Sequence, residues 1–270
     1  MNKEYLICID SDGCAMDTMN IKHIECFGPW MVRTWGLETW QEEILERWNE
    51  INLYSMTRGI NRFKALALVL AEIDERMARI EGVNEFAEWA QNAPELSNEA
   101  LETEIKKSKS PVFKEALAWS EAVNEAIAAL PNEKKQPFEG VTEGLKAAHE
   151  FADVAIVSSA NEEAVREEWQ RCGLMEYVDI LLCQNAGSKA SCIAELKKRG
   201  YDEKHILMVG DAPGDKAAAE KNHVFYYPIL ARREAESWRE LVDTGFEKLK
   251  NGTYESYELD KEKQFIRNLA

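Results

Sequence analysis

Acidic side chains follow two apolar segments that lie far apart in the sequence. Asp10 and Asp12 come directly after the first apolar run, and Asp211 and Asp215 follow a later one. Ligand sites in open parallel sheets lie beyond the carboxyl ends of the strands, so all four carboxyl groups are expected at one edge of a sheet. Two carboxylates about 4 Å apart repel each other by about 4 kcal/mol at an effective dielectric constant of 20. A divalent cation would remove that repulsion, and ligation by oxygen alone favours Mg²⁺ over Zn²⁺.

Two further polar residues are expected at the same edge. Ser158 ends an apolar run, and Lys189 stands in the first turn of a predicted helix. A cation in the first turn opposes the helix dipole, which favours the interpretation that Lys189 faces a dedicated anion. Plainer interpretations stay open, because a strand-end Asp or Ser commonly caps a helix or forms a turn, and a lone lysine is commonly solvated.

A parallel sheet is needed to bring these residues together, and the sequence predicts one. Five short apolar runs are nearly continuous rather than alternating, which is typical of strands buried on both faces. Helical segments separate the last four runs, including Glu162–Cys172 after Asn161 and a helix from Ser188 to Arg199. This alternation predicts an α/β fold with a doubly wound, Rossmann-like parallel sheet. The predicted strands are Glu4–Asp10, Asp153–Ser158, Tyr177–Cys183, His205–Gly210 and His223–Pro228.

A large helical insertion separates the first two predicted strands. Apolar residues recur there at three- and four-residue spacing, as over Arg62–Ile80 and Val112–Leu130, and six of the eight tryptophans lie within it. We therefore predict a sheet domain formed by residues 1–16 and 137–270 and a helical domain formed by residues 17–136, whose core most of these tryptophans fill. After Ala231, one helix is predicted to about Lys250, followed by a polar stretch.

The order and placement of the polar residues resemble those of a known family. Asp10-Ser11-Asp12-Gly13, then Ser158, then Lys189, then Gly210-Asp211-x-x-x-Asp215 are similar to the four motifs of the haloacid dehalogenase-like (HAD) hydrolase superfamily. The resemblance covers the sheet domain, and the insertion after the first strand is similar in position to the C1-type helical cap of the family, although it is long for that class. One position departs from the pattern, because Cys14 stands where the family usually has Thr or Val.

The resemblance implies a role for each motif residue. Asp10 would be the nucleophile that forms an aspartyl-phosphate, and Asp12 would protonate the leaving oxygen and later deprotonate the attacking water. Ser158 would donate a hydrogen bond to the transferred phosphoryl group, Lys189 would offset its charge, and backbone N–H groups up to Gly13 would cradle it. The Mg²⁺ cofactor would be held by Asp10, by the backbone carbonyl of Asp12 and by Asp211, and Asp215 would be a further ligand or would orient the other ligands.

The carboxyl group at position 12 indicates the type of reaction. Dehalogenases of this family lack a carboxylate there and phosphonatases carry a small residue, so Asp12 favours phosphoryl transfer from an alkoxide leaving group. We predict a Mg²⁺-dependent phosphatase that cleaves a phosphomonoester of a small metabolite. A phosphomutase acting on a sugar phosphate and a catalytically silent binding scaffold with the same fold are the alternatives. A receiver domain is disfavoured, because it is much shorter and has no large insertion.

A basic segment of the insertion is the candidate for substrate recognition. Residues 51–70 include Arg58, Arg62 and Lys64 but no Asp or Glu, although the chain carries 49 acidic residues. We predict that Arg58 and Arg62, in a loop that enters a helix, bind an anionic part of the substrate. The alternative is that they pair with acidic residues of neighbouring helices.

Composition limits the class of partner. The formal net charge of −16 and the lack of a long basic run argue against nucleic acid or an anionic membrane as the main partner. No apolar stretch approaches the ~20 residues that span a bilayer, and the apolar run near the N-terminus is too short for a signal peptide. The six cysteines form no CxxC pair, which indicates reduced thiols in a cytoplasmic protein. The oligomeric state is left open.

Overall fold

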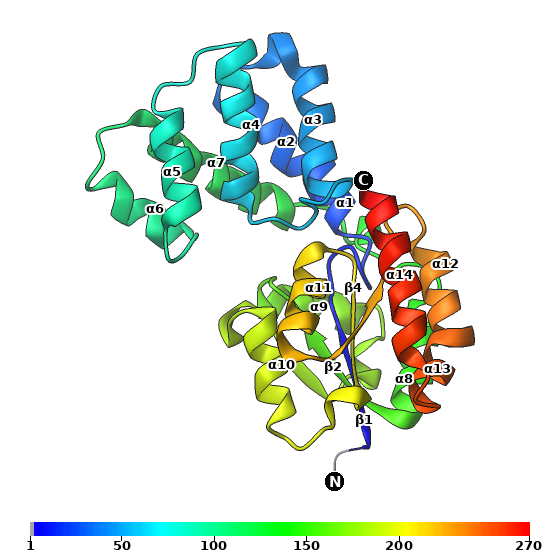
Figure 1. Cartoon of the computed structure of the whole chain (residues 1–270). Helices are drawn as coiled ribbons and strands as arrows, with labels where there is room; N and C mark the ends of the chain where they lie inside the picture. Colours follow the sequence, from blue (N-terminus) through cyan, green and yellow to red (C-terminus); the bar gives the residue numbers. More distant parts are fainter. Residues whose placement is uncertain (1–2) are drawn as a thin grey trace. The chain divides into compact units, whose positions relative to one another are not determined.

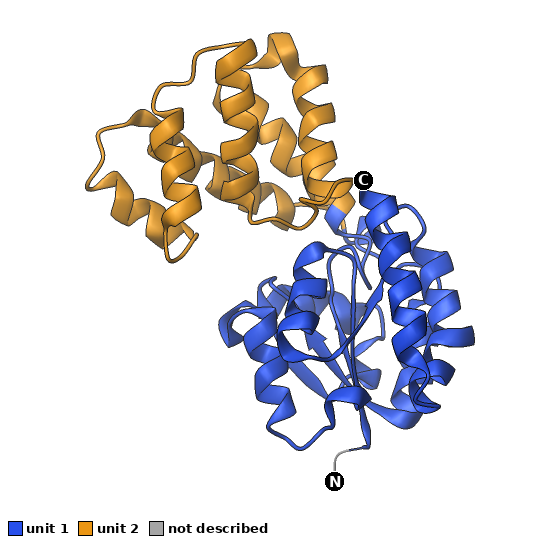
Figure 2. Cartoon of the chain, viewed as in Figure 1, with its two compact units in different colours: residues 1–19, 132–270 blue, residues 20–131 orange. Residues whose placement is uncertain are grey.

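The computed structural model describes residues 3–270, and they divide into two compact units (Figure 2). Unit 1 runs to Met19 and resumes over Asn132–Ala270, and unit 2 is Asn20–Pro131. These boundaries lie three to five residues from the expected ones, because both connecting segments pair with each other inside unit 1. The Asp17 N–H donates to the carbonyl of Gln136 at 2.8 Å. No helix of the described residues is long and apolar enough to cross a membrane.

Unit 1 is built on one parallel sheet, which confirms the predicted fold class. Its strand order is β3-β2-β1-β4-β5, so the first strand of the chain lies in the middle. Every neighbouring pair is parallel, and β1 is hydrogen-bonded to β2 on one side and β4 on the other. Four strands lie within predicted ones: β1 is Tyr5–Ile9, β3 is Ile180–Leu182, β4 is Ile206–Gly210 and β5 is Phe225–Pro228. The fifth, β2, is Ala152–Val157 and begins one residue before its predicted start.

Helices cover both faces of the sheet (Figure 1). Alternate residues of β1 face opposite sides, with Ile7 and Ile9 in one hydrophobic cluster and Leu6 and Cys8 in the other. The first cluster includes residues of α8 (Val141–Phe151), α9 (Glu162–Arg171), α12 (Glu234–Glu240) and α13 (Phe246–Lys250). The second includes residues of α10 (Lys189–Lys197), α11 (Pro213–Asn222) and α14 (Tyr254–Leu269). Burial on both faces explains why the strands read as continuous apolar runs.

Unit 2 is helical and has its own core. Trp48 and Trp119 are fully buried in it, and their rings meet edge to face with centroids 5.9 Å apart. The other four tryptophans of the insertion are partly buried against the same cluster, as expected from their spacing. Its helical elements are α1 (Met19–Ile21), which begins at the last residue of the first segment of unit 1, a π-helix (Lys22–Phe27), α2 (Gly28–Thr34), a 3₁₀-helix (Glu38–Trp40), α3 (Gln41–Leu53), α4 (Arg62–Arg76), α5 (Val83–Asn92), α6 (Asn98–Ile105) and α7 (Pro111–Ala128).

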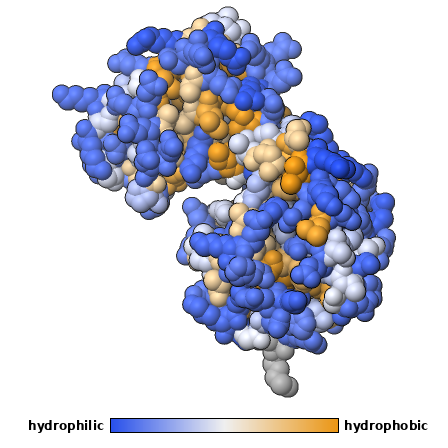
Figure 3. All heavy atoms as spheres, viewed as in Figure 1, coloured by the Kyte–Doolittle hydropathy of each residue, from blue (hydrophilic) through white to orange (hydrophobic). Residues whose placement is uncertain are grey.

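The helix predicted to end near Lys250 is present as one continuous run of α12, a π-helical turn (Leu241–Gly245) and α13. The polar stretch after Lys250, which the sequence does not predict as a helix, contains the 16-residue helix α14. The buried stripe of α14 includes a lysine, which hides the helical pattern in the sequence. Lys261 is only 4% exposed, because its ammonium group lies 2.5 Å from Glu240 Oε1 and 5.4 Å from the ring centroid of Tyr257. Hydrophilic residues cover much of the visible surface of the chain (Figure 3).

Candidate active site

Three carboxyl groups meet at the carboxyl ends of β1 and β4. Oxygen atoms of Asp10, Asp211 and Asp215 lie within 4.8 Å of one another, and all three side chains are buried. The register of the sheet brings them together, since the Asp10 N–H donates to the carbonyl of Val209 at 3.0 Å. A compact set of oxygen donors with this charge fits a hard divalent cation such as Mg²⁺. The carboxylates therefore suit the metal expected from the sequence.

Lys189 lies among these carboxylates. Its Nζ atom is 2.8 Å from Asp10 Oδ2 and 2.5 Å from Asp215 Oδ1. Burial alone would lower the pKa of Lys189, but the two carboxylates outweigh burial and raise that pKa, so the side chain stays an ammonium group. The side chain of Ser188 caps α10 by accepting from the Ser191 N–H, which sets the start of the helix that carries Lys189.

Asp215 is fixed by the backbone around it. Its Oδ2 atom accepts from the Ala212 N–H at 3.1 Å, its Oδ1 atom bonds Lys189, and its exposed fraction is 0%. Gly210 is required beside it, because a Cβ atom at that position would lie 2.4 Å from Asp215 Cγ. The glycine before Asp211 therefore leaves the space that Asp215 fills.

A tight turn follows the nucleophile candidate. The carbonyl of Ser11 accepts from the N–H groups of Ala15 and Met16 at 3.0 and 2.8 Å, so residues 11–16 form one closed turn. Gly13 has a φ of 82°, which favours glycine, and its own N–H donates to the carbonyl of Met16 at 2.9 Å. Gly13 thus shapes the turn, and binding of phosphate by the backbone N–H groups of Ser11–Gly13 stays a prediction. Asp12 is half-buried and accepts a hydrogen bond from Thr18 Oγ1.

Ser158 and Cys14 flank the carboxylates. Ser158 follows β2, is 3% exposed, and accepts at Oγ from the Ala160 N–H at 3.2 Å. A hydroxyl that accepts one bond can still donate its proton, so the turn-forming and phosphate-binding interpretations of Ser158 are compatible.

Burial, together with the charge of Asp211, raises the pKa of the Cys14 thiol well above its usual range. Cys14 is therefore held as a neutral thiol and is a poor nucleophile.

The two arginines lie in unit 2, where a turn leads into α4 as predicted. Arg58 is 2% exposed, and its Nη1 atom donates to a backbone carbonyl five residues earlier at 2.6 Å. Arg62 Nη1 donates to Asn124 Oδ1 at 2.7 Å and Ser120 Oγ at 3.1 Å. Burial lowers the pKa of Arg62 to about 10, and within residues 3–270 no carboxylate lies at ion-pair distance from it. Neutral partners thus hold Arg62, which disagrees with the alternative of an acidic partner on a neighbouring helix.

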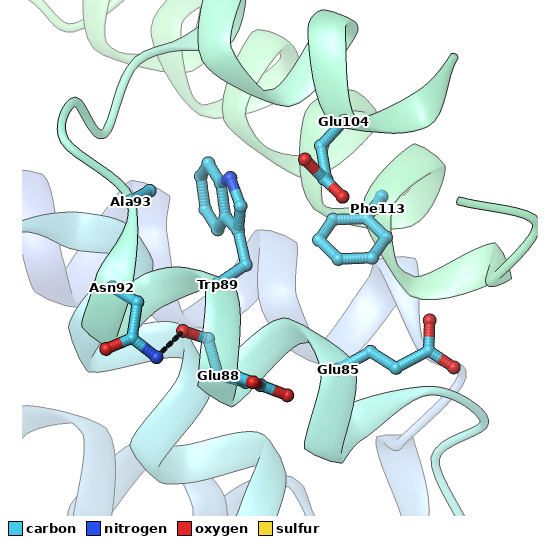
Figure 4. A pocket seen from close by; sticks show the side chains of 7 residues that line it. All are labelled: Glu85, Glu88, Trp89, Asn92, Ala93, Glu104 and Phe113. Carbon is cyan, nitrogen blue, oxygen red and sulfur yellow. Dashed lines mark hydrogen bonds between the residues drawn. The ribbon is translucent and has the colours of Figure 1, made fainter. Parts of the chain in front are cut away.

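Unit 2 also contains a hollow of about 380 Å³ (Figure 4). None of the motif residues lines it. Its charged groups are all carboxylates, so a phosphomonoester would be repelled there. The lining residues are Glu85, Glu88, Trp89, Asn92, Ala93, Glu104 and Phe113.

Two side-chain contacts to the first residues of the turn after β1 were not predicted from the sequence. Thr18 bonds Asp12, and the buried indole of Trp169 donates from Nε1 to Ser11 Oγ at 2.9 Å. No motif pointed to either residue. The indole contact joins positions 158 residues apart, so it depends on how α9 packs on the sheet.

The fold is a Rossmann-like parallel sheet with an inserted helical unit, and three buried carboxyl groups meet at one edge of the sheet. The sequence pattern of the haloacid dehalogenase-like hydrolases matches residues 69–227, more than half of the chain. The chain therefore belongs to the haloacid dehalogenase-like hydrolase family. The matched region includes Ser158, Lys189, Asp211 and Asp215, whereas Asp10 and Asp12 precede it.

Solved structures share this fold at low sequence identity. A haloacid dehalogenase-like family hydrolase from Streptococcus pneumoniae is 12% identical, covers 87% of this chain and 90% of its own, and has a TM-score of 0.50. A candidate phosphoglycolate phosphatase from Lactobacillus delbrueckii subsp. bulgaricus is 16% identical, with coverage of 84% and 85% and a TM-score of 0.54. A candidate haloacid dehalogenase-like hydrolase from Bacteroides fragilis is 10% identical, with coverage of 87% and 93% and a TM-score of 0.50. At these identities the likeness establishes the fold alone. No curated protein sequence matches the chain.

Proposed function

We propose that this hydrolase is a Mg²⁺-dependent phosphatase that cleaves a phosphomonoester of a small metabolite through an aspartyl-phosphate. The observation that carries the proposal is the cluster of Asp10, Asp211 and Asp215, with oxygens within 4.8 Å of one another and Lys189 bonded to two of them. Carboxylates alone would repel a phosphate dianion, so the site needs both the lysine and a cation to accept one.

The residues present can hold that cation. Asp10 and Asp211, with the backbone carbonyl of Asp12, would ligate Mg²⁺, and Asp215 is a further ligand or holds Lys189 in place. When bound, Mg²⁺ supplies positive charge that offsets the phosphoryl oxygens. Lys189 contributes further positive charge, since its ammonium group contacts Asp10 at 2.8 Å.

Asp10 and Asp12 divide the reaction between them. A carboxylate oxygen of Asp10 forms a bond to phosphorus while the bond to the leaving alkoxide oxygen breaks, and Asp12 gives that oxygen its proton. Asp12, now ionised, takes a proton from water, whose oxygen attacks the phosphorus and releases phosphate and the Asp10 carboxylate. The hydrogen bond from Thr18 Oγ1 orients the Asp12 carboxyl group for both proton transfers. Ser158 donates its hydroxyl proton to a phosphoryl oxygen.

We propose that unit 2 is the cap that selects the substrate. Arg62 is half-buried, held by neutral partners, and suited to a second anionic group such as a carboxylate. Arg58 is the second candidate. The name of the candidate phosphoglycolate phosphatase from Lactobacillus is compatible with a small anionic substrate of this kind. Alanine substitution of either arginine is expected to raise KM and leave kcat little changed, and unchanged KM values for both would exclude this role.

Hydrolysis of para-nitrophenyl phosphate, and then of a panel of phosphorylated metabolites, tests the proposal. Activity should require Mg²⁺, disappear on chelation, and be lost in Asp10→Asn, which keeps the size of the side chain. Lys198→Met is a matched surface control, because Lys198 is exposed and pairs only with neighbouring Glu195 in the contacts described. Bisphosphate-dependent interconversion of sugar phosphates would indicate a phosphomutase. No turnover by the wild type would favour the scaffold alternative.

We also propose that the protein works in the cytoplasm. All six cysteines are free thiols and five are buried, an arrangement that suits a reducing compartment. A fractionation experiment that recovered the protein outside the cytoplasm would contradict this proposal.

A further inference from the structure

Two buried tryptophans hold the turn after β1 from outside. Trp169 donates from Nε1 to Ser11 Oγ at 2.9 Å, and Trp238 donates from Nε1 to the carbonyl of Cys14 at 2.9 Å. Both tryptophan side chains have an exposed fraction of 0%. They come from different helices, Trp169 from α9 and Trp238 from α12, so the turn is anchored at two of its residues by two separate elements.

Ser11 links Trp169 to the carboxyl group of Asp10. The backbone N–H of Ser11 donates to Asp10 Oδ1 at 2.8 Å, while Asp10 Oδ2 accepts from Lys189. Ser11 is fully buried and its carbonyl closes the turn. A rotation of Ser11 would therefore move the N–H that orients Asp10. The hydrogen bond from Trp169 to the hydroxyl of Ser11 prevents that rotation.

Both indoles are held firmly in place. Trp169 lies in the hydrophobic cluster beneath the sheet, and its carbonyl accepts from the Leu174 N–H at 2.9 Å. Trp238 packs against α8 where that helix has a glycine. A Cβ atom at Gly144 would lie 2.5 Å from Trp238 Cε3, so this packing depends on the glycine. An indole N–H fixed in a close-packed core is a rigid donor, which is what a reacting group needs from its support.

We propose that Trp169 is a positioning residue for the nucleophile, acting through Ser11, and that Trp238 is a second anchor of the same turn. This inference rests on the proposed phosphatase function. Trp169 touches neither the metal ligands nor Lys189 in the contacts described, and it acts by keeping one orientation of the Asp10 carboxyl group. Its loss lowers the rate of phosphoryl transfer and leaves substrate affinity almost unchanged.

A double-mutant cycle tests the contact. Trp169→Phe removes the donor, Ser11→Ala removes the acceptor, and kcat, KM and the midpoint of urea unfolding are measured for both single variants and the double variant. Each single variant should lose about tenfold in kcat, equivalent to about 1.4 kcal/mol, with KM within about twofold. The double variant should be no slower than the slower single variant, because both changes break one interaction.

Tyr201→Phe is the matched control. It removes an aromatic donor from the opposite end of the same sheet, where Tyr201 Oη bonds Asp153 near the start of β2 at 2.5 Å. This variant should be destabilised and keep the wild-type kcat. If Trp169→Phe keeps kcat within about twofold, or if the two losses multiply in the double variant, the inference is wrong. Should Trp169→Phe not fold, Ser11→Ala decides alone, and a wild-type kcat in it overturns the inference.

Failure of the proposed function is a separate outcome. If the wild-type protein hydrolyses no phosphomonoester, that function fails, and the affinity for Mg²⁺ measured by calorimetry becomes the readout. Misorientation of Asp10 should then weaken Mg²⁺ binding about tenfold in Trp169→Phe and in Ser11→Ala, but not in Tyr201→Phe. Equal Mg²⁺ affinities in all four proteins overturn the inference.

Discussion

Replacing Lys189 by methionine removes the positive charge from the carboxylate cluster while keeping a side chain of similar length. In the wild-type protein the ammonium group lies 2.8 Å from Asp10 Oδ2 and 2.5 Å from Asp215 Oδ1. The exposed fraction of the Lys189 side chain is 15%, and the two carboxyl side chains are 8% and 0% exposed. Water therefore screens these charges weakly, and the substitution leaves neighbouring carboxylates without their shared partner.

The expected loss follows from this burial. Removing one partner of a buried ion pair costs about 3–5 kcal/mol, because the remaining charge is left uncompensated. A change of 1 kcal/mol shifts the melting temperature of a domain of roughly this size by about 2–4 °C, so Lys189→Met should melt about 6–20 °C lower in the absence of metal. Mg²⁺ should restore part of this loss. A ligand at 100 times its Kd stabilises by about 2.7 kcal/mol, and the more negative site of the variant should bind the cation more tightly.

Thermal unfolding followed by circular dichroism, with EDTA or with excess Mg²⁺, measures both effects. Lys198→Met is the control on the same segment, because its ion pair with Glu195 is exposed and contributes about 0–1 kcal/mol. The wild type and this control should melt within a few degrees of each other. The reasoning is refuted if Lys189→Met melts with the wild type in EDTA, or if Mg²⁺ raises its melting temperature less than it raises that of the wild type.

Three further predictions concern the metal, the end of β4 and the C-terminal helix. Removal of divalent cations with EDTA should abolish hydrolysis, and Mg²⁺ should restore it more fully than Zn²⁺, since the donors are all oxygen; activity in EDTA would contradict this. Gly210→Ala should lower kcat at least about tenfold, because the new Cβ would lie 2.4 Å from Asp215 Cγ, whereas Gly214→Ala meets no atom within 4 Å and should keep activity. Burial, opposed by the Tyr226 N–H, raises the pKa of Glu258 to about 7 from 4.5. The folded state then holds a proton that the unfolded chain has lost, so the unfolding free energy of the wild type should fall as the pH rises from about 5 to 8. Glu258→Gln should remove roughly 1–2 kcal/mol of that fall. Parallel pH profiles of the two proteins would contradict this role of Glu258.

The sheet and its acidic edge could be predicted because their signals are local. Continuous apolar runs bounded by polar residues marked each strand, and the spacing of Asp10 to Asp12 and of Asp211 to Asp215 placed carboxyl groups at strand ends. Parallel pairing then required these ends to share one edge. The roles of the individual residues in catalysis remain predictions, as does the division of labour between the two units.

The features that the sequence did not reveal depend on contacts between distant elements. The helix α14 was missed because its buried stripe includes Lys261, whose charge is compensated by Glu240 from α12. The anchoring of Ser11 by Trp169 joins a turn and a helix with no shared motif. In the sequence, a buried lysine looks like an exposed residue. A tryptophan that bonds a turn looks like an ordinary core residue. Only the packed structure distinguishes them.

The central place of β1 has a consequence for synthesis of the chain. This strand leaves the ribosome well before the two strands with which it pairs, β2, Ala152–Val157, and β4, Ile206–Gly210. During this time β1, which carries Asp10 at its end, has no partner strand. Unit 2 can already fold, because it is one continuous segment of the chain. Nascent chains that end before Asp211 lack both this carboxylate and strand β5, so they should depend on chaperones and lack hydrolytic activity.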